Sequence, residues 1–197
     1  MLFRSGGWRL STSRMADDRP ALRRRLRAAR RAVPASARPS AAAAIDRALA
    51  RLGLPRPGTR ISAFHPFDGE IDPSVAIRRA RALGCRVYYP VITSLRARRM
   101  RFVAQGDASD AIDARWLDLV LMPLVGFDAD GNRLGMGAGF YDRKFAFLRH
   151  RRAWHRPLLL GIAFDGQRME RFDASPHDVP LWGVVTERAV YGRAASR

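Results

Sequence analysis

The sequence contains very little cysteine and lysine and lacks any long apolar run. Cys85 is its single cysteine, so an intramolecular disulfide and a four-cysteine zinc site are both excluded. Because Cys85 precedes the strand-like segment RVYY without an adjacent histidine, we interpret it as a buried thiol and not as a nucleophile. No apolar run approaches the roughly 20 residues that a membrane-spanning helix requires. The longest runs, 117–125 and 158–164, have the length of buried strands.

Basic residues are abundant, and almost all of them are arginine. Lys144 is the only lysine among 36 basic residues, and the formal net charge is +18. A charge of this size is typical of nucleic-acid-binding proteins, so a non-enzymatic RNA-binding protein is an alternative function. The arginines are, however, spread along the whole chain, and the strong preference for arginine over lysine indicates a GC-rich genome. We therefore expect no nucleic-acid partner and a basic surface that suits small polyanions.

The first 14 residues differ in composition from the rest of the chain. They contain Arg4, Arg9, Arg14 and three serines but no acid, which is typical of a transit peptide. Alternatively, the translation start was assigned too early. Met15 and the following Ala-Asp-Asp are typical of a natural N-terminus, which favours this interpretation. We favour the second interpretation and expect 1–14 to be a disordered extension or a mis-assigned start. Residues 15–197 then form a single domain. We expect the protein to be cytoplasmic, because the first residues lack the apolar core of a secretory signal peptide.

The order of apolar and polar segments predicts an α/β fold. Helices are expected at 19–33, 40–52, 73–83 and 140–149, and strands at 61–64, 86–91, 100–104, 117–123, 158–164 and 184–186. In the first helix, apolar residues recur at spacings of three and four, so that one face can pack. Alternating strands and helices require crossover connections. We therefore expect one domain with a mostly parallel, Rossmann-like sheet that helices cover on both faces.

The most informative segment is the loop 126–139, which lies between an expected buried strand and an expected helix. Gly135, Gly137 and Gly139 alternate in it, and glycine lets a backbone adopt positive φ and approach a ligand closely. Consecutive backbone amides that end at a helix N-terminus form a concave anion site, for which phosphate is the natural ligand. Arg133 and Arg143 flank the glycines and can add charge-assisted hydrogen bonds. The spacing fits neither a Walker A loop nor the G-x-G-x-x-G motif of Rossmann oxidoreductases.

Four segments together resemble the 5-formyltetrahydrofolate cyclo-ligase family. The sequence NRLGMGAGFYDR at 132–143 is similar to the signature of the family, and HPFDGEIDP at 65–73 is similar to its folate-contacting turn. The sequence SPHDVPLWGVVTE at 175–187 is similar to its C-terminal segment. The expected first helix resembles the basic N-terminal helix of the family, in which two basic residues lie four positions apart. The resemblance implies that 15–197 is a cyclo-ligase domain.

The resemblance also implies a reaction. It implies an ATP-dependent enzyme that converts 5-formyltetrahydrofolate to 5,10-methenyltetrahydrofolate and releases ADP and phosphate. A formyl group on a ring nitrogen is an amide and a poor electrophile, so ATP phosphorylates the formyl oxygen before the second folate nitrogen attacks the carbon. Such a reaction requires phosphate positioning, charge neutralisation and Mg²⁺. We therefore expect ATP and the folate as partners, Mg²⁺ as cofactor, no membrane partner and a monomer.

The resemblance further implies which positions contact each ligand. ATP is implied to bind Arg19, Arg23, Arg133, Leu134, Gly135, Met136, Gly137, Ala138, Gly139, Phe140 and Tyr141. The folate is implied to bind His65, Glu70, Met136, Gly137, Ala138, Gly139 and Phe140. Arg133 and Tyr141 are implied to take part in catalysis. The chain departs from the family at Met136 and Ala138, where arginine, lysine or glycine is common, and at Trp182, where an acid is common.

The carboxylates and the histidine of these segments have both functional and structural interpretations. Asp142 and Asp178 are candidate ligands of Mg²⁺, which takes one or two carboxylates together with phosphate oxygens and water. Asp142 could instead stabilise a helix N-terminus, and Asp178 could cap a loop. Glu70 can accept hydrogen bonds from a pterin ring or simply precede the next helix. His65 follows an apolar strand, and we expect it to contact ligand or core without acid–base work.

Overall fold

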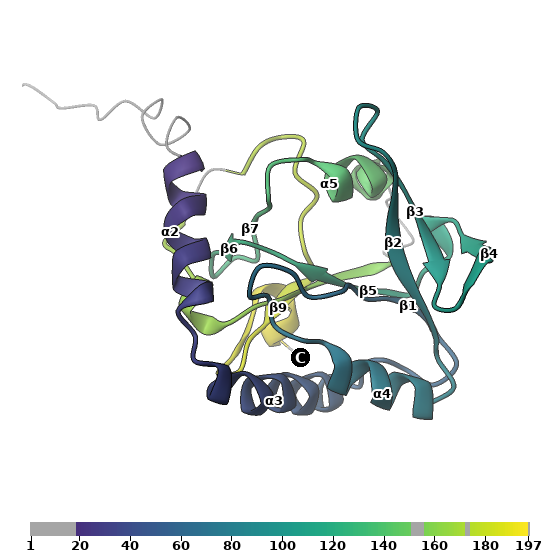
Figure 1. Cartoon of the computed structure of the whole chain (residues 1–197), viewed down its shortest axis with the longest axis horizontal. Coiled ribbons are helices and arrows are strands. Elements are labelled where there is room, and N and C mark those ends of the chain that lie inside the picture. Colours follow the sequence, from purple (N-terminus) through teal and green to yellow (C-terminus); the bar gives the residue numbers. More distant parts are fainter. Residues whose placement is uncertain (1–18, 151–155, 172–173, 197) are drawn as a thin grey trace, which may run out of the picture.

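The computed structural model describes residues 19–150, 156–171 and 174–196, which form one α/β domain (Figure 1). The α-helices are α2 Arg19–Arg31, α3 Arg38–Arg51, α4 Ser74–Ala82 and α5 Phe140–Lys144. The strands are β1 Arg60–Ser62, β2 Arg86–Ser94, β3 Arg99–Ala104, β4 Asp107–Ile112, β5 Leu119–Pro123, β6 Gly126–Phe127, β7 Arg133–Leu134, β8 Leu158–Ile162, β9 Gly183–Val185 and β10 Val190–Tyr191. The predicted extension 1–14 lies outside the described residues. None of the described helices combines the length and the apolar character of a membrane span.

Eight strands form one sheet in the order β10-β9-β8-β5-β1-β2-β3-β4. Its centre is parallel, since β1 pairs with β2 and β5, β5 pairs with β8, and β8 pairs with β9. Its two edges are antiparallel, since β9 pairs with β10, β2 with β3 and β3 with β4. The predicted mostly parallel sheet in one α/β domain is therefore confirmed, and the antiparallel edges are an addition to it.

The central strands bury alternate residues on opposite faces of the sheet, because successive side chains of a strand point in opposite directions. Leu119 and Leu121 of β5 belong to one hydrophobic cluster, whereas Val120 and Met122 of the same strand belong to another. All four side chains are at most 2% exposed. A strand that is buried on both faces has a continuous apolar sequence, and this explains the run LVLMP.

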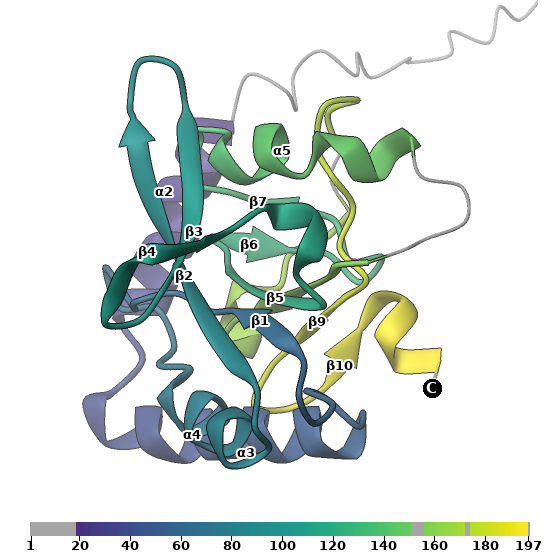
Figure 2. The ribbon, with the colours of Figure 1, turned by 90° about the vertical axis from the view of Figure 1, so that its right-hand side faces the viewer.

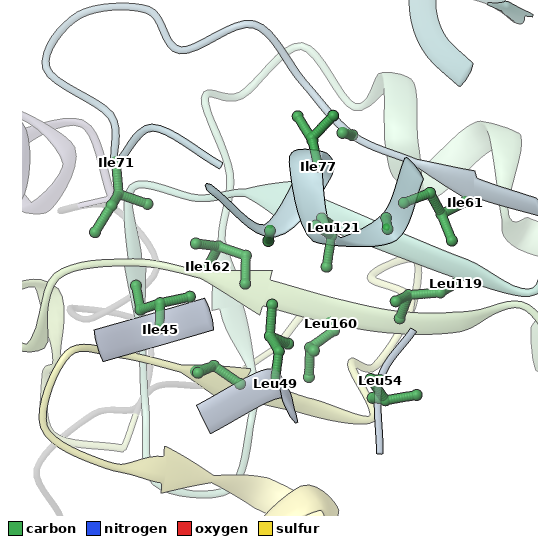
Figure 3. Packing of buried hydrophobic residues seen from close by; sticks show 14 of the residues in the cluster. Ile45, Leu49, Leu54, Ile61, Ile71, Ile77, Leu119, Leu121, Leu160 and Ile162 are labelled. Atoms are coloured by element: carbon green, nitrogen blue, oxygen red, sulfur yellow. The ribbon is translucent and has the colours of Figure 1, made fainter. Parts of the chain in front are cut away.

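Helices cover both clusters, as predicted. The view in Figure 2 places α3 and α4 on one side of the sheet and α5 on the other. In the first cluster, Ile45 and Leu49 of α3 lie against Leu160 and Ile162 of β8 (Figure 3). In the second cluster, Phe145 directly after α5 is fully buried. The remaining helix, α2, stands beside the sheet next to β6 and β7 (Figure 1).

Several predicted boundaries were wrong. The helix expected at 140–149 is divided, because Phe145 leaves the α-helical conformation and a 3₁₀-helix, Ala146–His150, follows. The loop expected at 126–139 contains the hairpin of β6 and β7. Strand β4 was not predicted because its sequence, DASDAI, is polar, as befits an edge strand with a single neighbour. The first helix ends at Arg31 and the second begins at Arg38, two residues before each predicted position.

Candidate active site

The loop that contains Gly135, Gly137 and Gly139 is called the glycine loop below. A cavity of about 380 Å³ lies where this loop approaches the carboxyl end of β5. Ligands of open parallel sheets commonly bind at this end of the strands. The cavity is lined by Arg19, Arg23, Pro90, Ile92, Met100, Pro123, Arg133, Leu134, Gly135, Met136, Gly137, Ala138, Gly139, Phe140, Tyr141, Asp142, Ser175 and Asp178. The structure thus brings together, in one cavity, every residue that was predicted to bind ATP and both predicted metal ligands.

Two of the three glycines of the loop adopt the positive φ that the sequence allowed. Gly137 and Gly139 have φ of 99° and 69°, whereas Gly135 is not in the positive-φ region. Gly139 precedes the first residue of α5, which is only five residues long. So short a helix has a weak dipole, and the anion site predicted at its N-terminus depends instead on the loop and on neighbouring arginines.

Helix α2 supplies two of these arginines. Leu26 of this helix packs over Gly126, where a Cβ atom would lie 2.4 Å from Leu26 Cδ1 and displace that side chain. The Arg23 Nε atom donates a hydrogen bond of 2.9 Å to the Gly135 carbonyl oxygen, and Arg19 Nη1 lies 3.8 Å from Asp178 Oδ2. Burial and, next, the charge of Arg19 lower the pKa of the Arg23 guanidinium. Two crowded cations at a cavity wall favour an anionic ligand.

Arg133 is buried in the cavity wall and bonds to protein groups. Its Nη1 donates a hydrogen bond of 2.6 Å to the Val179 carbonyl oxygen, and its Nη2 donates to Asp142 Oδ1. The Val179 N–H donates to the same carboxylate oxygen at 3.1 Å. Arg133 therefore ties the glycine loop to α5 and to the segment 174–179, which sequence reasoning did not foresee.

The two candidate metal ligands each use a single oxygen in these contacts. Among the described residues, Asp142 accepts hydrogen bonds only through Oδ1, and Asp178 accepts one of 2.8 Å from the Ser175 N–H through Oδ2. Among the residues that the structure describes, no three His, Cys, Asp or Glu side chains are grouped to hold a metal ion. Two carboxylates that share a cavity nevertheless fit Mg²⁺, because phosphate oxygens and water complete its coordination. The second oxygen of each carboxylate would be available to coordinate such an ion.

The predicted folate residues His65 and Glu70 do not line this cavity. Glu70 accepts hydrogen bonds from the Phe67 N–H at 3.2 Å and from Arg30 Nη1 at 3.3 Å. Burial raises the pKa of Glu70, although the Phe67 amide and the charge of Arg30 oppose the shift. Burial and, next, the charge of Glu70 raise the pKa of Tyr141. The charge of Glu70 therefore reaches Tyr141, a residue of the cavity wall, although Glu70 itself does not line the cavity.

His65 is exposed and stacks on Tyr89, with ring centroids 4.3 Å apart. That His65 has no acid–base role stays a prediction.

Sequence reasoning missed the apolar side of the cavity. Pro90 and Ile92 of β2, Met100 of β3 and Pro123 of β5 line it. Ile92 is 50% exposed although it is apolar, which suggests a surface that a flat ring system can cover. No local signal marks Pro90, Ile92 and Met100, because the β2–β3 hairpin brings them to the cavity only in the folded chain.

Two other positions lie away from the cavity. Trp182 packs against the core cluster under α3 and donates a backbone hydrogen bond of 2.8 Å to the Leu159 carbonyl oxygen. The loss of an acid at this position therefore does not change the cavity wall. Arg143, which was expected to assist the glycine loop, lines a neighbouring cavity together with Arg98, Arg99 and Lys144.

Known proteins show the same sequence pattern and fold. The model of the "5-formyltetrahydrofolate cyclo-ligase family" matches residues 15–187. The 5-formyltetrahydrofolate cyclo-ligase of Escherichia coli K12 is 32% identical over 148 residues, which are 66% of this chain and 79% of that protein. The Mycolicibacterium smegmatis protein of the same name is 30% identical over 178 residues, which are 81% of this chain and 88% of that protein.

A solved structure gives the same result. The 5,10-methenyltetrahydrofolate synthetase of Mycoplasma pneumoniae superposes with a TM-score of 0.74 at 26% identity, over 86% of this chain and 99% of that one. The family resemblance that the sequence predicted is therefore confirmed. With the family model matching most of its length, the chain belongs to the 5-formyltetrahydrofolate cyclo-ligase family of enzymes.

Proposed function

We propose that this protein catalyses the ATP- and Mg²⁺-dependent conversion of 5-formyltetrahydrofolate to 5,10-methenyltetrahydrofolate, with release of ADP and phosphate. The observation that carries the proposal is the single cavity that gathers the α2 arginines, the glycine loop and two carboxylates. Cations and backbone amides suit phosphates, and the carboxylates suit the metal ion that accompanies them. The names of the relatives in Escherichia coli and Mycolicibacterium smegmatis support the folate as substrate.

In this proposal the ATP phosphates lie between α2 and the glycine loop. Arg19 and Arg23 neutralise phosphate charge, and the backbone amides of 134–141 donate hydrogen bonds to phosphate oxygens. Arg133 holds the Asp142 carboxylate in place through its Nη2 bond and donates to phosphate only if ATP displaces one of its protein partners. Bound Mg²⁺ would supply charge neutralisation and orientation of the phosphates.

The folate lies, in the same proposal, between the glycine loop and the turn that carries Glu70. The Glu70 carboxylate accepts hydrogen bonds from N–H groups of the pterin ring, and Ile92 and Met136 cover an apolar face of the substrate. The raised pKa of Tyr141 keeps its hydroxyl protonated at neutral pH, so Tyr141 can donate a hydrogen bond but cannot act as a base.

Two displacements complete the reaction. The formyl oxygen attacks the terminal phosphorus of ATP, and ADP leaves. The second folate nitrogen then attacks the activated carbon and loses its proton, and the formyl oxygen leaves as part of phosphate. A site that aligns the formyl oxygen with the terminal phosphate supplies most of the catalysis, because phosphoryl transfer depends on positioning and charge neutralisation.

We expect the purified protein to form the methenyl product only when ATP and Mg²⁺ are both present, because Asp142 and Asp178 would hold a cation that neutralises phosphate charge. The absorbance of methenyltetrahydrofolate gives the rate directly. Turnover that persists in excess chelator would exclude the metal-dependent mechanism. Folded protein that makes no product but binds RNA in a salt-sensitive manner would instead support the RNA-binding alternative.

That the enzyme works as a monomer in the cytoplasm stays a prediction. Light scattering during size-exclusion chromatography, with and without ATP, tests the first part of it.

A further inference from the structure

One arginine of α2 is buried and does not line the active-site cavity. Arg30 is 1% exposed, which is unusual for a residue that is always charged. It lies on the last turn of α2, whereas Arg19 and Arg23 lie on the first two turns. At 1.5 Å per residue, the helix separates Arg19 from Arg30 by roughly 16 Å. Helix α2 runs along the side of the domain from the level of α5 to that of α3 (Figure 1).

Arg30 bonds to the turn that carries Glu70 and to the end of the sheet. Its Nη1 donates to Glu70 Oε1 at 3.3 Å and to the Leu124 carbonyl oxygen at 3.4 Å. Its Nη2 donates to Asp68 Oδ2 at 2.9 Å, and its Nε donates to the Asp68 carbonyl oxygen at 3.1 Å. One planar guanidinium therefore fixes two carboxylates and a carbonyl of the central sheet with respect to α2.

The neighbouring arginines hold Asp68 but not Glu70. Arg27 Nε donates to Asp68 Oδ2 at 2.8 Å, and Arg31 pairs with Asp68 Oδ1. Asp68 adopts a φ of 54°, a conformation that a non-glycine residue rarely takes without support. Asp68 thus has three arginine partners. Among the described residues, only Arg30 forms an ion pair with Glu70.

We propose that Arg30 is a positioning residue for folate recognition: it orients the Glu70 carboxylate, and it connects that carboxylate to the helix that presents Arg19 and Arg23 to ATP. This inference rests on the proposed function, in which Glu70 accepts hydrogen bonds from the pterin ring. A buried carboxylate without a cationic partner would favour its neutral form, which is a poorer acceptor. Arg30 therefore acts on the folate through Glu70 and touches no substrate itself.

A double-mutant cycle tests the inference. The affinity for 5-formyltetrahydrofolate and, separately, for ATP with Mg²⁺ is measured by calorimetry for wild type, Arg30→Met, Glu70→Gln and the double variant. We expect Arg30→Met to weaken folate binding about 10- to 100-fold and ATP binding by less than about twofold. In the Glu70→Gln background, Arg30→Met should weaken folate binding by less than about twofold, because the carboxylate that Arg30 positions is already absent.

Two further variants separate positioning from general stability. Arg30→Lys keeps the charge but loses the fork of donors, so it should restore part of the folate affinity that Arg30→Met loses. If Arg30→Met fails to fold, Arg30→Lys in both Glu70 backgrounds gives the same comparison. Arg31→Gln removes a partner of Asp68 but none of Glu70, and it should leave folate affinity within about twofold of wild type.

Three results would overturn the inference. Arg30→Met could weaken folate binding equally in the wild-type and Glu70→Gln backgrounds. It could also weaken ATP binding as much as folate binding. Either result would mean that Arg30 only stabilises the fold. Unchanged folate affinity in Arg30→Met, with normal binding by the wild type, would remove the positioning role and leave the proposed function standing. A wild-type protein that does not bind 5-formyltetrahydrofolate would remove the proposed function itself.

Discussion

Replacing Arg133 with alanine is expected to lower kcat/KM for ATP about 10- to 150-fold. The change removes a charge-assisted hydrogen bond to Asp142, and such a bond contributes about 1.5–3 kcal/mol. Without its partner, the Asp142 carboxylate loses its fixed orientation in the cavity. The Val179 carbonyl oxygen loses a donor as well, so the free energy of unfolding should fall by about 1–3 kcal/mol. Steady-state kinetics at varied ATP and urea unfolding measure the two effects.

Arg86→Ala is the matched control for this experiment. Arg86 lies at the amino end of β2, its side chain is 65% exposed, and its ion pair is with Asp110 on the edge strand β4. The change in net charge is the same, but an exposed ion pair contributes only about 0–1 kcal/mol. We expect ATP kinetics close to those of wild type. An Arg133→Ala enzyme with the same ATP kinetics as this control would contradict the role of the Arg133–Asp142 pair.

Glu70→Gln is expected to weaken folate binding about 10- to 150-fold and to leave ATP binding nearly intact. Glutamine has the same shape but no charge, and it replaces one acceptor with a donor, so it cannot accept two N–H groups of a pterin ring. Separate titrations with 5-formyltetrahydrofolate and with ATP measure the two affinities. An effect of Glu70→Gln on ATP alone would mean that the two halves of the site are assigned in reverse.

The same variant changes the pH dependence of folate binding. The wild type should lose folate affinity as the pH falls through the pKa of Glu70. Because burial raises this pKa, the loss should occur at a higher pH than for a protein with an ordinary glutamate at this position. For folding the sign is opposite. A carboxyl group whose pKa is higher in the folded than in the unfolded state stabilises the fold at pH values below the unfolded-state pKa. This contribution is lost as the pH rises through the folded-state pKa. Glu70→Gln should therefore remove the acid-side loss of affinity without a large fall in melting temperature at neutral pH.

The parallel centre of the fold could be predicted from the sequence because its strands are buried on both faces. The runs that contain Leu119–Pro123 and Leu158–Ile162 are continuously apolar and are bounded by turns, which is a strong local signal. The edges could not be predicted in the same way. Strand β4 is polar, and β6, β7 and β10 have only two residues each, so long-range pairing decides them.

Local sequence patterns predicted the candidate site only where its residues are close in the sequence. The distant residues Arg19, Arg23 and Asp178 were implied by the family resemblance. The glycine loop and Asp142 lie within one short segment, and their shared cavity agrees with that prediction. The contact of Arg30 with Glu70 spans 40 positions, and that of Arg133 with Val179 spans 46. Arginines recur four positions apart along α2, at 19, 23, 27 and 31, which predicts a basic face along the helix. Arg30 lies outside that series, so this pattern does not predict its contact with Glu70.

The fate of the formyl oxygen tests the central claim most directly. In the proposed reaction this oxygen attacks the terminal phosphorus of ATP and leaves with the phosphate. Substrate labelled with oxygen-18 at the formyl group should therefore yield one labelled oxygen in each phosphate released, in step with methenyl product. Mass spectrometry of the phosphate provides the answer. Unlabelled phosphate from a reaction that forms the methenyl product would contradict phosphorylation of the formyl oxygen.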